Sequence, residues 1–179
     1  MERPAVCAGI EQEDRLLIID DDEGEGRFET AGQLQTKRIS ATGGPLGDDF
    51  IVCGGGEDVY LPPLSRCELY SVSTNSWRRL SGKGMPVAVH NAAAISHEGH
   101  FYVIGEANRW SPFPSMSERR IWYALVEWRG ALFALGGRGR PNDDSLDTVE
   151  RWDASTNEWT LLDVKLPNGG RQELAAIVY

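Results

Sequence analysis

Two stretches decide the fold of this chain: residues 51–80, IVCGGGEDVYLPPLSRCELYSVSTNSWRRL, and residues 133–162, FALGGRGRPNDDSLDTVERWDASTNEWTLL. They align without a gap, each residue of the second standing 82 positions after its counterpart in the first. Both carry a glycine pair, an aromatic residue and a tryptophan at the same spacing: Gly54, Gly55, Tyr70 and Trp77, then Gly136, Gly137, Trp152 and Trp159. Chance rarely keeps so many uncommon residue types in register, so the chain contains an internal repeat.

Each copy predicts four antiparallel β-strands. An apolar strand, an X-Gly turn and a second apolar strand ending at the glycines form a hairpin pattern. After a polar loop comes an alternating strand, then a tight turn at Asn75 or Asn157, where asparagine tolerates a positive φ, and a fourth strand beginning at the tryptophan. A third glycine-ended strand, residues 101–105, follows a turn at Glu98-Gly99 and ends at Gly105. The unit therefore has four strands in about 50 residues, the period of a propeller blade.

The glycine pair followed by a spaced aromatic residue and tryptophan resembles the kelch repeat, and the resemblance covers residues 16–179. It implies an all-β fold, a β-propeller whose blades of four antiparallel strands pack through their tryptophans and apolar strands. The repeat itself implies no built-in chemistry.

The copies are unequal, so we expect an incomplete or open propeller. We divide the chain into an acidic N-terminal tail (1–15) and a repeat region (16–179). The repeat region comprises a partial blade (16–30), a blade (38–80), a shortened blade (90–116), a blade (120–162) and a lone inner strand (171–179). In the shortened blade Gly105 stands alone and Trp110 marks the fourth strand. Three outcomes remain open: a fragment of a larger propeller, which we favour, an assembly of copies joined through open blade edges, or a small strained ring.

Composition excludes several classes of partner. The 179 residues carry 18 Lys or Arg against 27 Asp or Glu, a formal charge of −9, so we expect no nucleic-acid partner. The longest apolar runs have about six residues, far too few to cross a bilayer, and we expect no membrane contact. The three cysteines, Cys7, Cys53 and Cys67, form an odd and sparse set that does not indicate a disulfide framework and favours a reducing compartment, the cytoplasm.

Basic residues precede each inner strand. Arg38 and Arg120 both stand 16 positions before a blade glycine, and His90 and Arg171 occupy similar places. The resemblance implies that this linker and the loop after the glycines form the face that binds partner peptides, where arginines meet acidic side chains. The alternative is that each arginine only hydrogen-bonds a neighbouring blade. In the loops after the glycines, Tyr60 and Leu61 are candidate apolar anchors, and Arg138 and Arg140 are further candidate partner-binding residues.

No nucleophile, base and orienting group converge in a recognisable motif, so we expect a non-catalytic interaction module with a protein or peptide partner, no cofactor and no metal site. The resemblance adds the role of substrate recognition in a ubiquitin-ligase adaptor. The alternative is the remnant of a propeller enzyme such as a galactose-oxidase-like copper oxidase. With three histidines, two of them, His97 and His100, on one turn, a copper site would be hard to build.

Overall fold

The structure is a computed structural model that describes residues 6–7, 15–20, 27–58, 60–82, 84–105, 113–139, 144–172 and 176. These residues form strands, turns and loops, and among them no helix is long and apolar enough to span a membrane. The chain divides into two compact units, residues 1–90 and 91–179, which we describe separately. Trp110, Arg140 and most of the expected lone strand after Arg171 lie outside the described residues.

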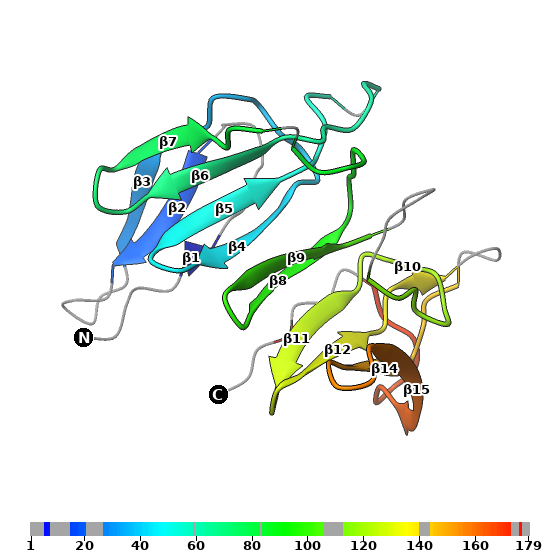
Figure 1. Cartoon of the computed structure of the whole chain (residues 1–179). Helices are drawn as coiled ribbons and strands as arrows, with labels where there is room; N and C mark the ends of the chain where they lie inside the picture. The colour runs from blue at the N-terminus through cyan, green and yellow to red at the C-terminus, as the bar shows by residue number, and fades with distance from the viewer. Residues whose placement is uncertain are drawn as a thin grey trace. The chain divides into compact units, whose positions relative to one another are not determined.

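The first unit contains a three-stranded and a four-stranded sheet, both antiparallel (Figure 1). The three-stranded sheet has the order β1-β2-β3, and the four-stranded sheet runs β4-β5-β6-β7 in sequence order. Their bounds are β1 Val6–Cys7, β2 Arg15–Asp20, β3 Arg27–Gln33, β4 Thr42–Leu46, β5 Asp49–Cys53, β6 Cys67–Ser71 and β7 Ser76–Arg79.

A hydrophobic core cluster of this unit lies on one face of the four-stranded sheet. Phe50 and Val52 from β5 and Tyr70 from β6 bury their side chains with Trp77 of β7 and with Leu34, which follows β3. Tyr70 and Trp77 are directly opposite in register, and their ring centroids lie 5.3 Å apart. The repeated aromatic pair is therefore a cross-strand core pair, the kind of contact that stabilises a sheet.

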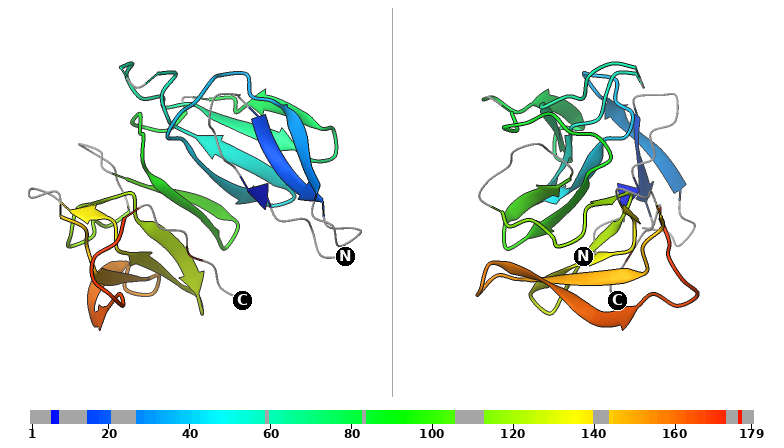
Figure 2. Two further views of the ribbon diagram at one scale, coloured as in Figure 1. Left: turned by 180° about the vertical axis from the view of Figure 1, so that it is seen from behind. Right: turned by 90° about the vertical axis from the view of Figure 1, so that its right-hand side faces the viewer.

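The second unit repeats the four-stranded blade and adds a separate hairpin. Its blade has the order β11-β12-β14-β15, and its β14–β15 hairpin, in orange, stands out in Figure 2. The hairpin β8-β9 and the short pair β10-β13 are two-stranded. The bounds are β8 Ala93–His97, β9 His100–Ile104, β10 Arg120–Ile121, β11 Ala124–Trp128, β12 Ala131–Leu135, β13 Arg138–Gly139, β14 Thr148–Asp153 and β15 Glu158–Lys165.

Aromatic rings join the β8-β9 hairpin to this blade. Trp152 of β14 packs against His97 of β8 and Tyr102 of β9, with centroid distances of 6.1 and 6.0 Å. Phe113 lies 4.7 Å from Trp152 and 6.1 Å from Trp159. The repeat tryptophans of this unit thus pack between sheets, as the resemblance implies for propeller blades.

The turns have the backbone that the sequence predicts. Asn75 and Asn157 both adopt a positive φ, 48° and 55°. The X-Gly turn at Glu98-Gly99 has positive φ at both residues, as the two-residue turns of right-twisted hairpins require. Together with the strand orders β4-β5-β6-β7 and β11-β12-β14-β15, these turns confirm the predicted all-β fold with blades of four antiparallel strands.

The cysteine prediction is wrong for one pair. Cys53 and Cys67 form a disulfide, and their Cα atoms lie 4.1 Å apart. They end β5 and begin β6, and the register of the two strands places them directly opposite each other. A residue count cannot reveal this pairing, because it depends on strand register.

Candidate functional site

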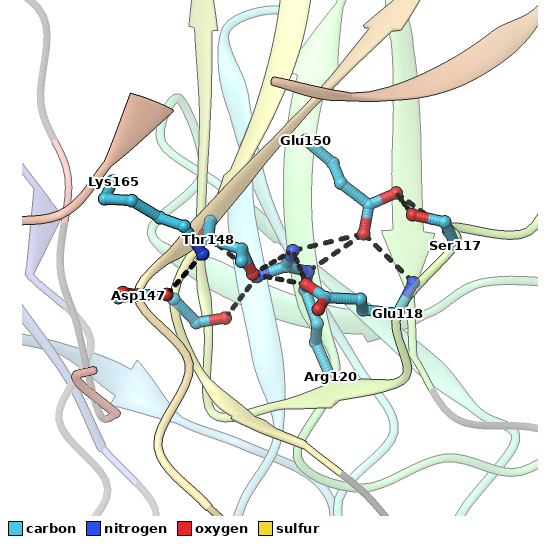
Figure 3. Close-up of polar contacts among 8 residues, drawn as sticks. Ser117, Glu118, Arg120, Asp147, Thr148, Glu150 and Lys165 are labelled. Carbon is cyan, nitrogen blue, oxygen red and sulfur yellow. Dashed lines mark hydrogen bonds and ion pairs between the residues drawn. The ribbon is translucent and has the colours of Figure 1, made fainter. Parts of the chain in front are cut away.

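The linker arginine of the second blade lies inside the blade (Figure 3). Arg120 of β10 has a side chain that is 0% exposed. One guanidinium nitrogen donates to the backbone oxygens of Gly136 and Thr148, at 2.8 and 3.0 Å. The guanidinium also pairs with Glu150 of β14, at 3.1 Å from Nη2 and 3.2 Å from Nε. A buried charge must be paired and hydrogen-bonded, and here both requirements are met.

The carboxylate of Glu150 is satisfied from the other side by the linker. The backbone N–H and the hydroxyl of Ser117 both donate to its Oε2 at 2.8 Å, and the Glu118 N–H donates to Oε1 at 3.2 Å. Glu118 adds a second carboxylate 2.7 Å from Arg120, and the Thr148 hydroxyl donates to that same carboxylate. Figure 3 shows these side chains converging on the guanidinium.

The first blade contains the same arrangement 82 positions earlier. Arg38, also 0% exposed, donates to the backbone oxygens of Gly54 and Arg66 at 2.7 and 2.9 Å and to Glu68 at 2.8 Å. The N–H of Gln35 donates to the other oxygen of Glu68 at 2.6 Å. We call each set of linker arginine, two carbonyls and glutamate an arginine latch. The latch ties the linker to both stems of the loop after the glycines.

The burial of Arg38 and Arg120 changes their interpretation. Neither guanidinium reaches solvent, and their hydrogen bonds go to their own blade. We therefore do not propose either as a partner-binding residue. Sequence reasoning aligned Glu68 with Glu150 but assigned them no role. The available signal was their constant position 30 residues after the linker arginine.

The linker position recurs at Val89 and Arg171. Val89 precedes Gly105 by 16 positions, as Arg38 precedes Gly54, and a residue with positive φ follows two positions later in each case. Val89, and not His90, is therefore the counterpart of the latch arginines. The described part of the β8-β9 sheet has no third strand to supply a glutamate, and the linker carries an apolar residue, 2% exposed, in place of the cation.

The second glycine of each pair fixes the linker that follows the blade. Gly55 N–H donates to Val89 O and Gly137 N–H to Arg171 O, both at 2.7 Å. A Cβ on Gly55 would lie 2.6 Å from Ile39 O, and one on Gly137 would lie 2.8 Å from Ile121 O. The second glycine is thus needed because the linker before the blade and the linker after it both approach the end of the same strand.

Of the predicted basic residues that the structure describes, Arg171 and His90 are exposed. The Arg171 side chain is exposed and donates a long hydrogen bond, 3.4 Å, to Pro167 O. His90 is exposed at the end of the first unit. The guanidinium of Arg138, half-buried, stacks on the Trp122 ring at 5.6 Å from its centroid.

The loop between β5 and β6 presents the predicted apolar anchors to solvent. Tyr60 is 94% and Leu61 54% exposed. The loop is nevertheless organised, because Tyr60 N–H donates to the Asp58 carboxylate at 3.0 Å and Leu61 N–H to Asp58 O at 3.3 Å. Leu64 N–H donates to Gly55 O at 2.7 Å and closes the base. We call residues 54–66 the Tyr60 loop.

Two ionisable groups of the second unit have shifted pKa values. Burial raises the pKa of Tyr123 well above its usual value, and its hydroxyl donates to Ile104 O at 2.7 Å. At the surface, a hydrogen bond from Lys165 at 2.8 Å holds the pKa of Asp147 below its usual value (Figure 3).

Replacing Lys165 by methionine is expected to return the Asp147 pKa toward the ordinary carboxyl value. In the native protein the folded pKa is the lower one, so the pair stabilises the fold above the ordinary carboxyl pKa and loses this effect as the pH falls through the folded pKa. An NMR titration of the Asp147 carboxyl carbon measures the shift. An unchanged titration in the variant would contradict the assigned cause. Because the pair is exposed, we expect little change in stability.

A cavity of about 210 Å³ lies between β9 and the linker before β10, lined among others by Ile104, Gly105, Phe113 and Met116. Within the described ranges, no three His, Cys, Asp or Glu side chains gather as a metal site would require. His97 is buried against the aromatic rings, whereas His100 is exposed at the start of β9.

Comparison with known proteins supports the repeat assignment. Residues 123–162 match a family model described as the Kelch motif. Kelch-like protein 38 of Danio rerio is 29% identical over 127 residues, covering 63% of this chain and 21% of the relative. Kelch-like protein 23 of Homo sapiens is 24% identical over 156 residues, covering 78% and 27%. The chain thus spans about a fifth to a quarter of the length of these relatives.

Among solved structures, the one titled "Structure of YjhT" superposes with a TM-score of 0.76 and 16% sequence identity, covering 90% of this chain and 63% of that one. At this identity the likeness shows the fold alone. The motif match, the relatives and the repeated blades together show that the chain contains a Kelch motif, has the fold of kelch β-propeller blades and is similar to Kelch-like proteins.

Proposed function

We propose that this chain is a non-catalytic protein-interaction module that binds its partner through the Tyr60 loop. The observation that carries the proposal is the exposure of Tyr60 and Leu61 on a loop that hydrogen bonds hold in shape. Tyrosine is enriched among residues that dominate binding energy, and a pre-organised loop loses little entropy when it binds. The similarity to Kelch-like proteins supports the same class of function.

The finer points of the proposal follow from the resemblance. As part of a longer protein, the module would recognise substrates for a ubiquitin ligase in the cytoplasm. If the partner is acidic, His90 and Arg171 are predicted basic residues that are exposed to meet it, because Arg38 and Arg120 are committed to the latches. Exposed Leu161 and Val164 on β15 provide apolar area for self-association along a blade edge.

Replacing Tyr60 and Leu61 together by alanine is expected to weaken partner binding by about 10- to 100-fold. Stability should change by less than about 0.5 kcal/mol, because both side chains are exposed. The partner is first recovered with immobilised native protein, then purified, and its Kd is measured for each variant by titration calorimetry.

The matched control is Val72→Ala. Val72 is 57% exposed in the same blade but lies in the turn after β6, away from the Tyr60 loop. This control should bind like the native protein. Equal binding by the Tyr60/Leu61 variant and the native protein would refute the proposed site.

A further inference from the structure

The Tyr60 loop is closed at its base by the Cys53–Cys67 disulfide. We propose that reversible oxidation of this cysteine pair controls how firmly the loop is held for its partner. The inference rests on the proposed function of the loop. It assigns to that site a thiol–disulfide regulation, with a low-molecular-weight disulfide as the oxidant.

The position of the cysteine pair relates it directly to the Tyr60 loop. Cys53 is the last residue of β5 and Cys67 the first of β6, so the residues between them are those of the Tyr60 loop. A covalent bond across the two stems reduces the conformations open to the intervening chain. The loop is therefore more ordered in the oxidised protein than in the reduced one.

The second blade shows that the architecture does not need the sulfur atoms. Leu135 and Val149 occupy the corresponding positions 82 residues later, at the ends of β12 and β14, and they are paired in the same register. That blade has the same strand order and the same arginine latch. The cysteine pair is thus an addition to a blade that an aliphatic pair also closes.

The arginine latch of the first blade confines the effect of reducing the disulfide to the Tyr60 loop. All three acceptors of Arg38 are adjacent in sequence to a disulfide cysteine: Gly54 follows Cys53, whereas Arg66 and Glu68 flank Cys67. When the disulfide opens, the guanidinium still ties both stems, and the β5-β6 ladder remains. We therefore expect reduction to loosen the loop without unfolding the blade.

The chemistry balances as an exchange with a disulfide such as oxidised glutathione. The sulfurs of Cys53 and Cys67 form one bond while the disulfide bond of the reagent breaks, and two electrons pass from the protein sulfurs to the reagent. The two thiol protons end on the two glutathione thiols. Because Cys53 and Cys67 are only 2% and 8% exposed, the exchange requires a local opening of the stems.

The test measures hydrogen exchange at the loop amides in oxidised glutathione and in dithiothreitol, without any partner. The Tyr60, Leu61 and Leu64 amides, which donate inside the loop, should exchange about tenfold faster in the reduced protein. The Leu146 amide, which donates to Gly137 O in the second unit, is the internal control and should not respond. The variant Cys53→Leu/Cys67→Val copies the pair of the second blade and should show equal exchange in both conditions.

Three results would overturn the inference: equal loop exchange in both conditions for the native protein, faster exchange throughout β4–β7 on reduction, or alkylation of both cysteines after oxidation. Each can occur whether or not Tyr60 and Leu61 bind a partner. Conversely, if the Tyr60/Leu61 variant keeps full partner affinity, the proposed function fails even where the redox response is present.

Discussion

Replacing Glu68 by glutamine is expected to lower the free energy of unfolding of the first unit by about 3–5 kcal/mol. The carboxylate is 0% exposed and is the acidic group that pairs with Arg38 in the described part of the chain, so the neutral amide leaves a buried guanidinium without its counter-charge. Equilibrium denaturation followed by tryptophan fluorescence and circular dichroism measures the change.

The matched substitution in the second unit is Glu150→Gln, and we expect it to cost less. Arg120 keeps a second carboxylate, that of Glu118, at 2.7 Å after Glu150 is neutralised. Comparing the stability lost in Glu68→Gln with that lost in Glu150→Gln therefore tests whether the latch is stabilised by its charge pairing or only by its number of hydrogen bonds. Equal losses would contradict the charge explanation.

A further variant tests whether the blade needs the buried Arg38–Glu68 ion pair in order to fold. Replacing both Arg38 and Glu68 by apolar residues, methionine and leucine, removes both buried charges together. Such replacements are often neutral or stabilising, and the apolar Val89 at the equivalent linker position indicates that the backbone accepts one. The double variant should be more stable than Glu68→Gln.

The substitution Gly55→Ala is expected to destabilise the first unit by about 2–5 kcal/mol. Gly55 has a φ of 77°, where an L-residue costs about 1–2 kcal/mol. Its Cβ would lie 2.6 Å from Ile39 O and 3.0 Å from the Ala41 Cβ, so backbone must move, and overpacking adds about 1–3 kcal/mol. The shift would also strain the Gly55–Val89 hydrogen bond that positions the next linker.

Gly47→Ala is the control for the backbone contribution alone. Gly47 also has a positive φ, 63°, but a Cβ there would meet nothing within 4 Å. We expect a loss of about 1 kcal/mol, measured by the same denaturation experiment. If both variants lose the same stability, the close approach of the linkers does not explain the glycine pair.

Most of the fold could be predicted from the internal repeat. A spacing shared by two copies specified the strand order, the X-Gly hairpins and the positive φ of Asn75 and Asn157, because turns and alternation are local properties. The roles of Arg38 and Arg120 could not be predicted in the same way. Their distance from the glycines indicated the linker, but the direction of a long side chain depends on what packs around it.

The disulfide and the glutamates of the latches could not be predicted from the sequence either. Cys53 and Cys67 are 14 residues apart in sequence, and Arg38 and Glu68 are 30 apart. The two cysteines meet only because of the register of β5 against β6. Arg38 and Glu68 meet only because the linker before the blade passes over the ends of these strands. Neither contact leaves a local signature within one copy.

The sequence alone determined that this chain contains four-stranded antiparallel blades, because the alternation of apolar residues and the turn residues are local features of the chain. Tertiary structure decided which of its polar residues are internal and which face solvent. It buried Arg38 and Arg120 in latches and left Tyr60 and Leu61 exposed. The physical reason is that a buried charge must find its partner wherever strand packing places one, whereas a loop residue need only be held by its own backbone.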